Sequence, residues 1–217
     1  MVLSSLALKG VLEKLKPALG AIELRFDATQ AILASLAQGA KADLLILTAE
    51  ALEDLRGKGR VAEVVALGSS GVGVAVRSGA RKPDIRSIDA FVHALVNAES
   101  VAHSKVGASG IYFSELIKNL KIENKLKKLV IVEKGPVGLA VARGEAQLGI
   151  QQLCELAPVA GIDIVGPLPG PLQRLTYFAA GIPADAARPE TGRRVIELLR
   201  SPAARAAMAD GGMQAAP

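Results

Sequence analysis

Short apolar runs alternate with segments in which apolar residues recur every three or four positions along nearly the whole chain. The runs have the length of buried strands, and the periodic segments have the spacing of helices that pack one face on a sheet. This alternation predicts an α/β protein with mainly parallel sheets. The expected strands are 2–3, 22–26, 43–47, 100–103, 128–132, 148–151, 162–165 and 175–179, with a long extended segment at 64–76. The expected helices are 5–19, 29–36, 48–55, 88–96, 111–120, 137–143, 191–199 and 203–208.

Two extended segments flanked by Gly and Pro, near 68–76 and 166–178, interrupt the alternation. We expect the chain to cross there from one lobe to another and back. Lobe 1 then consists of residues 1–73 and 175–217, and lobe 2 of residues 74–174. Ligands of open α/β sheets bind beyond the carboxyl ends of the strands, so the expected site is a cleft between the lobes.

Proline residues interrupt the helix and strand pattern at two further places. Pro17 is expected to kink or fray the last turn of the first helix, because it lacks an N–H and clashes with the preceding turn. The run Gly166-Pro167-Leu168-Pro169-Gly170-Pro171 is expected to be irregular.

Composition narrows the function classes. Half of the 217 residues are hydrophobic, as in a folded globular protein, and the formal net charge of +5 suits an anionic partner without selecting one. The basic residues are scattered except at Lys125–Lys128, and the chain has only four Phe and two Tyr, so a nucleic-acid partner is not expected. No window of about 20 residues is uniformly apolar and uncharged, so no membrane span is predicted.

Neither a metal nor another cofactor is expected. His93 and His103 are not spaced with Cys154 or with carboxylates as metal ligands. Cys154 lacks a Cys-x-x-Cys partner and is expected to be buried and inert. The segment Gly68–Gly73 lacks the Gly-Lys-Ser/Thr ending of a phosphate loop and precedes a strand instead of a helix, which argues against nucleotide binding.

Four stretches place a hydroxyl or a glycine at an expected helix start: Ser4-Ser5, Asp27–Gln30, Gly107–Gly110 and Lys134–Pro136. Helix starts leave N–H groups unpaired and carry a partial positive charge. Several such starts facing one cleft make a site for a small anion.

Each start also has an ordinary structural explanation. Ser5 or Asp27 can simply cap a helix, the glycines can form a turn, and Lys134 can be a solvated surface residue. The functional interpretation is favoured because four such starts follow four strands. Gly107 and Gly110 then let a ligand approach the backbone. The candidate ligand-binding residues are Ser4, Ser5, Thr29, Gly107, Ser109, Gly110, Lys134, Gly135 and Gln152.

Besides Gln152, two further residues at strand ends, Gln151 and His103, are candidates for the cleft. The side-chain amides of Gln151 and Gln152 can donate to anion oxygens, and His103 is placed to line the cleft.

At these residues the chain resembles the periplasmic molybdate-binding proteins, which are type II two-lobed solute-binding proteins of ABC importers. The resemblance covers nearly the whole chain. It rests on Ser5 after the first strand and on Gly39–Ile46, Ser109–Tyr112, Gly144–Ile150 and Ser201–Ala204. It implies that Ser5 and Thr29 supply hydroxyls and that Ser109 and Lys134–Gly135 supply backbone N–H groups. It also implies an ABC permease as partner and a periplasmic location.

The chain departs from that family's pattern at two places in the expected site. Gln152 stands where the family commonly has Tyr, and Asp27-Ala28-Thr29 stands where it has a Ser-rich stretch. Lys134, Gln152 and Arg25 suit a carboxylate larger than a tetrahedral oxyanion. A branch with the Gly-Pro-Leu-Pro and Gln-Gln features is similar to trans-aconitate isomerase.

Three functions follow from this sequence. The leading hypothesis is a non-enzymatic solute-binding protein for a small anion, either an organic di- or tricarboxylate or a molybdate-like oxyanion. The alternative is an isomerase of an unsaturated polycarboxylate, whose base is Ser5, Ser109, Lys134 or His103, without a choice among them. A ligand-sensing domain of a DNA-binding regulator is disfavoured because no helix-turn-helix segment is present. No leader peptide precedes the first strand, so a cytoplasmic location stays open beside the periplasmic one.

Overall fold

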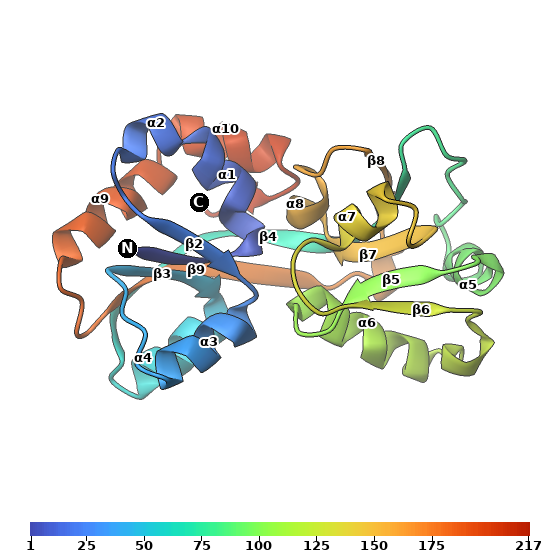
Figure 1. The fold of residues 1–217 in the computed structure, drawn as a ribbon, viewed down its shortest axis with the longest axis horizontal. Helices are drawn as coiled ribbons and strands as arrows, with labels where there is room; N and C mark the ends of the chain where they lie inside the picture. Colours follow the sequence, from blue (N-terminus) through green and yellow to red (C-terminus); the bar gives the residue numbers. More distant parts are fainter. The chain divides into compact units, whose positions relative to one another are not determined.

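The computed structural model describes residues 1–217 and is a mixed α/β protein (Figure 1). It divides into two compact units. Unit 1 consists of Met1–Ser70 and Thr176–Pro217, and unit 2 of Gly71–Leu175.

The strands are β1 Val2–Ser5, β2 Leu24–Asp27, β3 Leu44–Thr48, β4 Val61–Arg77, β5 Val101–Ser104, β6 Leu129–Val132, β7 Leu148–Gln152, β8 Ile162–Pro167, β9 Leu175–Pro183 and β10 Gln214–Ala215. The α-helices are α1 Lys9–Lys14, α2 Lys16–Leu19, α3 Thr29–Ala37, α4 Ala49–Gly57, α5 Ile88–Asn97, α6 Ala108–Asn119, α7 Val137–Ala142, α8 Leu153–Leu156, α9 Pro189–Leu199 and α10 Pro202–Asp210. Short 3₁₀ turns lie at η1 Leu6–Leu8, η2 Glu123–Lys125 and η3 Gly170–Leu172.

Unit 1 is built on a sheet with the strand order β2-β1-β3-β9-β4, and β10 pairs with β4. Strands β1, β2 and β3 are parallel, whereas β9 runs antiparallel to β3. Helices α3 and α4 cover one face of this sheet, and α1, α2, α9 and α10 cover the other (Figure 1). Both faces are therefore buried, and β3 is apolar almost throughout, as expected of a central parallel strand.

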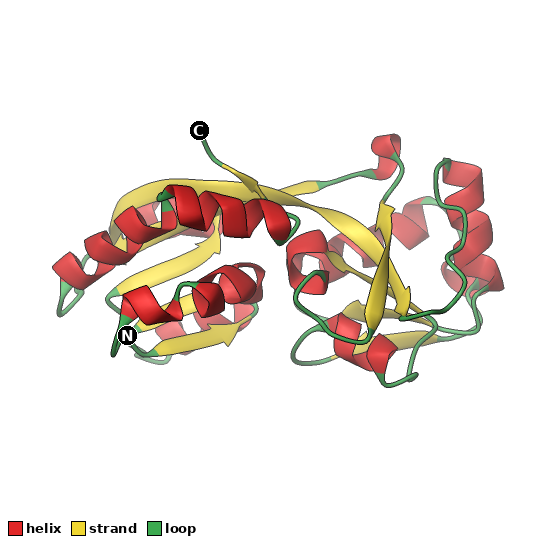
Figure 2. Cartoon of the chain, turned by 90° about the horizontal axis from the view of Figure 1, so that it is seen from above, coloured by secondary structure: helices red, strands yellow, loops and turns green.

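Unit 2 repeats the parallel arrangement on its own sheet. Strand β5 lies between β6 and β7, parallel to both, and β7 and β8 each pair antiparallel with β4. The core under α5 and α6 contains Phe91, Phe113, Val101 and Ile150, all nearly inaccessible to solvent. Strand β4 is 17 residues long and contains residues of both units. Figure 2 shows the strands in yellow and the helices in red.

The predicted α/β alternation is confirmed, and most element ends fall within two residues of those expected. The single helix expected at 5–19 is wrong, because a 3₁₀ turn, α1 and α2 occupy that stretch. The break lies at Leu15, so that Pro17 sits in the first turn of α2, where its missing N–H costs no helical hydrogen bond.

The expectation that residues 166–171 are irregular is wrong for its first two residues. Gly166 and Pro167 end β8, where Pro167 is opposite Gly73 and a register shift separates Val74 from Ala75. A bulge of this kind accommodates a proline at a strand end, because the local ladder is already interrupted. The segment Gly68–Gly73 lies within β4, which agrees with the argument against a phosphate loop.

Candidate functional site

The carboxyl ends of the three parallel strands of unit 1 lie at one edge of its sheet. Ser5 is opposite Asp27, and the preceding residue, Ser4, is opposite Ile46, two positions before the end of β3 at Thr48. Strand β1 is therefore flanked by the starts of α3 and α4 on its two neighbours. The structure brings Ser5, Thr29 and Thr48 to this edge, although Thr48 was not among the predicted site residues.

Ser5 carries the most informative side chain of this edge. The residue is 3% exposed, and its Oγ is a buried polar atom without a hydrogen-bond partner. It occupies the N-cap position of the 3₁₀ turn but makes no capping bond. Ser4 Oγ, in contrast, donates to the Ser5 carbonyl over 3.0 Å. A buried hydroxyl without a partner is costly in a folded protein, so a ligand that binds Ser5 Oγ would gain from satisfying it.

The start of α3 is held to the neighbouring strand by a side chain. Thr29 is the first residue of α3, and its Oγ1 accepts a hydrogen bond from the Thr48 N–H over 3.4 Å. Asp27 does not form a conventional helix cap, because its Oδ1 accepts the N–H of Ala28, which itself occupies the N-cap position. The Thr29 hydroxyl hydrogen is thus free to donate to an anion.

Unit 2 has a corresponding edge at the carboxyl ends of β5, β6 and β7. Ser104 is opposite Val132, and His103 is opposite Ile150, so the three strands end at nearly the same level. The loop before α6 follows β5, the segment Lys134–Pro136 follows β6, and Gln151 and Gln152 are the last two residues of β7. The structure thus brings Ser109, Gly135 and Gln152 to one edge of this unit.

Close packing against Ser104 accounts for the two glycines at the start of α6, Gly107 and Gly110. A Cβ on Gly110 would lie 1.8 Å from the Ser104 carbonyl oxygen, and one on Gly107 would lie 2.9 Å from Ser104 Oγ. The expectation that these glycines serve ligand approach therefore has a competing structural cause. The Gly107 N–H donates to Ser104 Oγ, and the Gly110 N–H donates to the Gly107 carbonyl. The first-turn N–H groups of Ala108 and buried Ser109 are left for an anion.

Residues Lys134–Pro136 precede α7. Lys134 is exposed, Gly135 has a positive φ of 86°, and Pro136 occupies the N-cap position instead of the first helical turn expected from the sequence. The first helical N–H, that of Val137, donates to Gln151 Oε1 over 2.8 Å. This helix start is therefore partly satisfied from within the protein.

The Gln151 side-chain amide links two elements of unit 2. It is therefore not available to donate to an anion, contrary to the expectation from the sequence. Its Oε1 accepts the Val137 N–H, and its Nε2 donates to Glu155 Oε2. Both ends of the amide are used inside unit 2, so Gln151 is a structural link between α7 and α8. Gln152 is 1% exposed and ends β7.

His103 is buried beneath α6. It is 5% exposed, its ring centroid lies 5.5 Å from that of Phe113, and its Nδ1 is 3.0 Å from the Ser104 carbonyl oxygen. Burial lowers the pKa of His103, and the hydrogen bond to Ser104 only partly opposes this effect. His103 is thus held neutral near pH 7 and packs as a core residue.

Glu155 is the titratable group of this edge that sequence reasoning missed. It is half-buried in α8, and burial raises its pKa from an ordinary value of 4.5 to about 7, with the Gln151 hydrogen bond acting in the opposite direction. The four-residue spacing of Gln151 and Glu155 gave no signal, because Gln151 lies in strand β7 and Glu155 lies in helix α8.

The remaining sequence expectations concern metal ligands and membrane spans. Cys154 is buried, as predicted, and His93 lies exposed on α5. The structure contains no group of three or more His, Cys, Asp or Glu side chains arranged to hold a metal ion. None of the helices combines the length and the apolar composition that a membrane crossing requires.

Comparisons with known proteins agree with this architecture. A family model described as bacterial extracellular solute-binding protein matches residues 13–214. A curated relative from Pseudomonas sp., named aconitate isomerase, is 38% identical over 230 residues that span 100% of this chain and 87% of the relative.

Solved structures show the same fold at lower identity. The periplasmic molybdate-binding protein of Azotobacter vinelandii superposes with a TM-score of 0.76 at 20% identity, covering 98% of this chain and 97% of that one. A sulfate-binding protein of Mycobacterium tuberculosis H37Rv superposes with a TM-score of 0.72 at 15% identity, covering 98% and 85% of the two chains. The fold is therefore that of a type II periplasmic binding protein, as the resemblance predicted.

Proposed function

Because the chain belongs to the bacterial extracellular solute-binding protein family, we propose that it binds one small carboxylate anion. In this proposal the hydroxyls of Ser5 and Thr29 in unit 1 donate to the anion. The first-turn N–H groups of α6, the Ser109 hydroxyl, Lys134, Gly135 and Gln152 supply the donors of unit 2. Ser4 lies directly behind Ser5 and supports its backbone.

The unpartnered Ser5 Oγ is the observation that carries the proposal. The protein retains a buried hydroxyl without a partner at the edge where α/β sheets bind ligands, which is explained if the partner is the ligand. Neutral hydroxyls and amides bind an anion well in a site with little water, because each hydrogen bond to a charged acceptor is strengthened there.

A carboxylate is favoured over a tetrahedral oxyanion by the relative named aconitate isomerase, which matches this chain over its full length. The molybdate- and sulfate-binding neighbours share the fold, but their identities of 20% and 15% carry no ligand across. Aconitate also has three carboxylates, so it can accept hydrogen bonds from several of these donors at once.

The same relative favours a second candidate function, isomerisation of the bound polycarboxylate. Interconversion of trans- and cis-aconitate needs removal of a proton from the carbon beside a carboxylate and return of a proton to the allylic carbon. Donors that hold the carboxylates also stabilise the negative charge that develops on them in the intermediate. Binding and catalysis thus draw on one set of donors.

The proposed biological context follows from the family. We assign the protein to the periplasm, with an ABC permease as partner if its function is uptake, and with no cofactor or metal needed for either function. Isomerisation by proton transfer uses only side chains of the protein and the substrate.

Thermal denaturation with a ligand panel tests the binding proposal. The panel contains trans-aconitate, cis-aconitate, citrate, succinate, molybdate and sulfate. A ligand at about 100 times its dissociation constant stabilises the folded state by about 2.7 kcal/mol, which raises the melting temperature by several degrees. We expect the largest rise with a tricarboxylate. No rise with any of the six anions would refute the proposal.

A further inference from the structure

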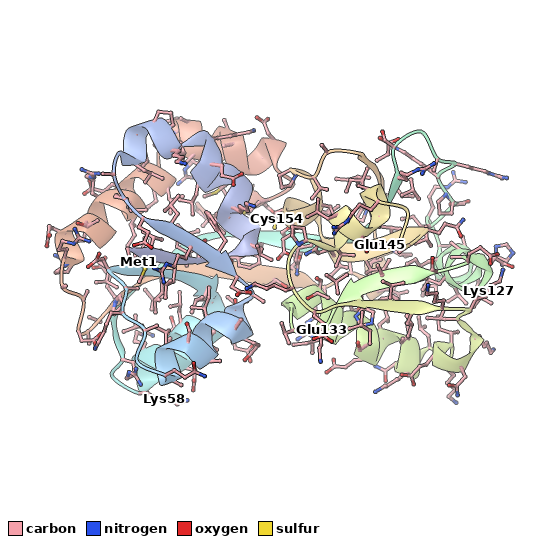
Figure 3. All side chains as sticks on the ribbon, in the orientation of Figure 1. Met1, Lys58, Lys127, Glu133, Glu145 and Cys154 are labelled. Atoms are coloured by element: carbon pink, nitrogen blue, oxygen red, sulfur yellow. The ribbon has the colours of Figure 1, made fainter.

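Glu155 lies at the carboxyl edge of the unit 2 sheet, on the short helix α8 that directly follows β7. Strand β7 is parallel to β5, whose own end leads into the α6 start. The labelled neighbour of Glu155, Cys154, marks the position of α8 in Figure 3. The Glu155 carboxyl group is thus on the same edge of unit 2 as the donors assigned above to the anion.

The Gln151 amide fixes the orientation of the Glu155 carboxylate. Gln151 Oε1 accepts the Val137 N–H over 2.8 Å, so its Nε2 must point the other way, where it donates to Glu155 Oε2. The second oxygen, Oε1, accepts no hydrogen bond from the protein, and Glu155 forms no ion pair. Oε2 is therefore held by a hydrogen bond, and Oε1 has lone pairs available to accept a proton.

No charged side chain of the surrounding elements offsets the burial of Glu155. Helix α8 packs on α7, β7 and β8. Strand β7 has no titratable residue, Cys154 is the other such residue of α8, and Asp163 of β8 is bound to Ser78 and Gly79. Arg143, which follows α7, pairs with Glu145. Burial therefore governs the carboxyl group and raises its pKa to about 7, where a general base works best near neutral pH.

We propose that Glu155 is the general base of the isomerisation, an assignment that rests on the proposed function. Glu155 Oε1 takes the proton from the methylene carbon of trans-aconitate, and an O–H bond replaces the C–H bond. The released electron pair forms a new C=C bond, and the pair of the old double bond moves into the adjacent carboxylate. The Glu155 carboxylic acid then returns a proton to the former alkene carbon, which yields cis-aconitate and restores the carboxylate.

The other candidates for the base fit this role less well. His103 is 5% exposed and packs on Phe113. Ser5 and Ser109 carry alcohols, which need a neighbouring base before they can accept a proton. Lys134 is exposed, whereas the Glu155 side chain is half-buried.

The test compares Glu155→Gln with wild type in heavy water, with trans-aconitate followed by proton NMR. Glutamine keeps an oxygen that accepts from Gln151 Nε2 but cannot take a proton. We expect the rates of cis–trans interconversion and of deuterium uptake to fall by about 100-fold or more, and the rise in melting temperature with trans-aconitate to persist. The control is Glu145→Gln, an exposed glutamate of the same unit that is labelled in Figure 3 and whose loss leaves both rates unchanged.

Two further measurements keep the assignment open to refutation if Glu155→Gln folds poorly. Glu155→Asp retains a carboxylate and is expected to keep a reduced but measurable rate. The wild-type rate is expected to rise through about pH 7 and to level off above it, because only the ionised carboxylate accepts a proton.

Failure of the inference and failure of the proposed function give different results. Full activity in Glu155→Gln overturns the role of Glu155 and leaves the isomerase function standing. A wild type that binds trans-aconitate but neither exchanges nor interconverts it overturns both the base and the isomerisation, and leaves anion binding. A wild type that binds none of the six anions overturns the whole proposal.

Discussion

The side-chain amide of Gln151 donates to the carboxylate of Glu155 while its oxygen accepts the first helical N–H of α7. One glutamine thereby ties a helix start to an acidic side chain at the edge of unit 2. The consequence is a carboxylate that is half-buried, uncompensated by a cation and held in one orientation. This geometry leads to a measurable effect on stability as well as to the catalytic proposal.

The free energy of unfolding is predicted to fall as pH rises, because Glu155 ionises. The folded-state pKa of about 7 lies above the ordinary value of 4.5, so the folded protein holds this proton more tightly than the unfolded chain. The group's contribution to the free energy of unfolding is full below about pH 4.5 and is lost as pH rises through about 7, a loss of about 3 kcal/mol. Urea denaturation of wild type and Glu155→Gln at about pH 5 and about pH 8 measures it. Equal pH dependence in both proteins would contradict the account.

Replacement of Ser5 by alanine separates binding from stability. Because Ser5 Oγ has no partner in the protein, Ser5→Ala is expected to leave the free energy of unfolding unchanged or to raise it by up to about 1 kcal/mol. The same change removes a donor to the anion and should weaken trans-aconitate binding about 10-fold, which corresponds to about 1.4 kcal/mol. Denaturation and calorimetric titration measure the two effects. A destabilised variant with unchanged affinity would assign Ser5 to the core alone.

Gly110 is predicted to be irreplaceable for a packing reason. An added Cβ would lie 1.8 Å from the Ser104 carbonyl oxygen, which belongs to rigid backbone, so α6 must shift away from β5. We expect Gly110→Ala to lose about 2 to 3 kcal/mol of stability in urea denaturation. Gly170→Ala is the matched control, because a Cβ there meets no atom within 4 Å. Equal losses in the two variants would show that the contact is not the cause.

Lys121 holds a backbone conformation that favours glycine. It has a φ of 55° directly after the end of α6, and the Ile122 N–H closes the helix onto the Ile117 carbonyl. Lys121→Gly is expected to raise the free energy of unfolding by about 0.5 to 1 kcal/mol, because glycine adopts this conformation without steric cost. Lys118→Gly, one turn earlier and inside the helix, should instead lower it by about 1 kcal/mol. The same sign in both variants would contradict the explanation.

Local sequence patterns predicted the parts of the fold that depend on local chemistry. Hydrophobic periodicity placed α3, α5 and α9, and strand-like apolar runs placed β3 and β6, because burial of one face or of a whole strand is encoded residue by residue. The order of these elements was enough for the α/β class and for the family resemblance.

What the sequence did not predict depends on contacts between distant segments. Pro167 is acceptable at the end of β8 because the pairing of β8 with β4 is already interrupted next to it, where Val165 of β8 has no partner in the register, and β10 exists because it pairs with β4. The four-residue helix α8 is too short to show a periodicity. Each of these features is fixed by a partner strand or by packing that no local window contains.

The candidate site was predicted in part for the same reason. Ser5 ends β1, Thr29 follows β2 and Ser109 follows β5. The parallel strands of one sheet bring their ends to a common edge. The hydrogen bonds of the Gln151 amide with Val137 and Glu155 could not be predicted from the sequence, because they depend on the packing of α7 against α8. The elevated pKa of Glu155 follows from that packing and not from its sequence neighbours.

Calorimetric titration of trans-aconitate into wild type, Ser5→Ala and Ser109→Ala tests the central claim most directly, because both serines are proposed to donate to the anion. The account predicts one saturable site per chain in wild type and about 10-fold weaker binding in each variant. The absence of saturable binding in wild type, or an affinity that neither serine changes, would contradict it.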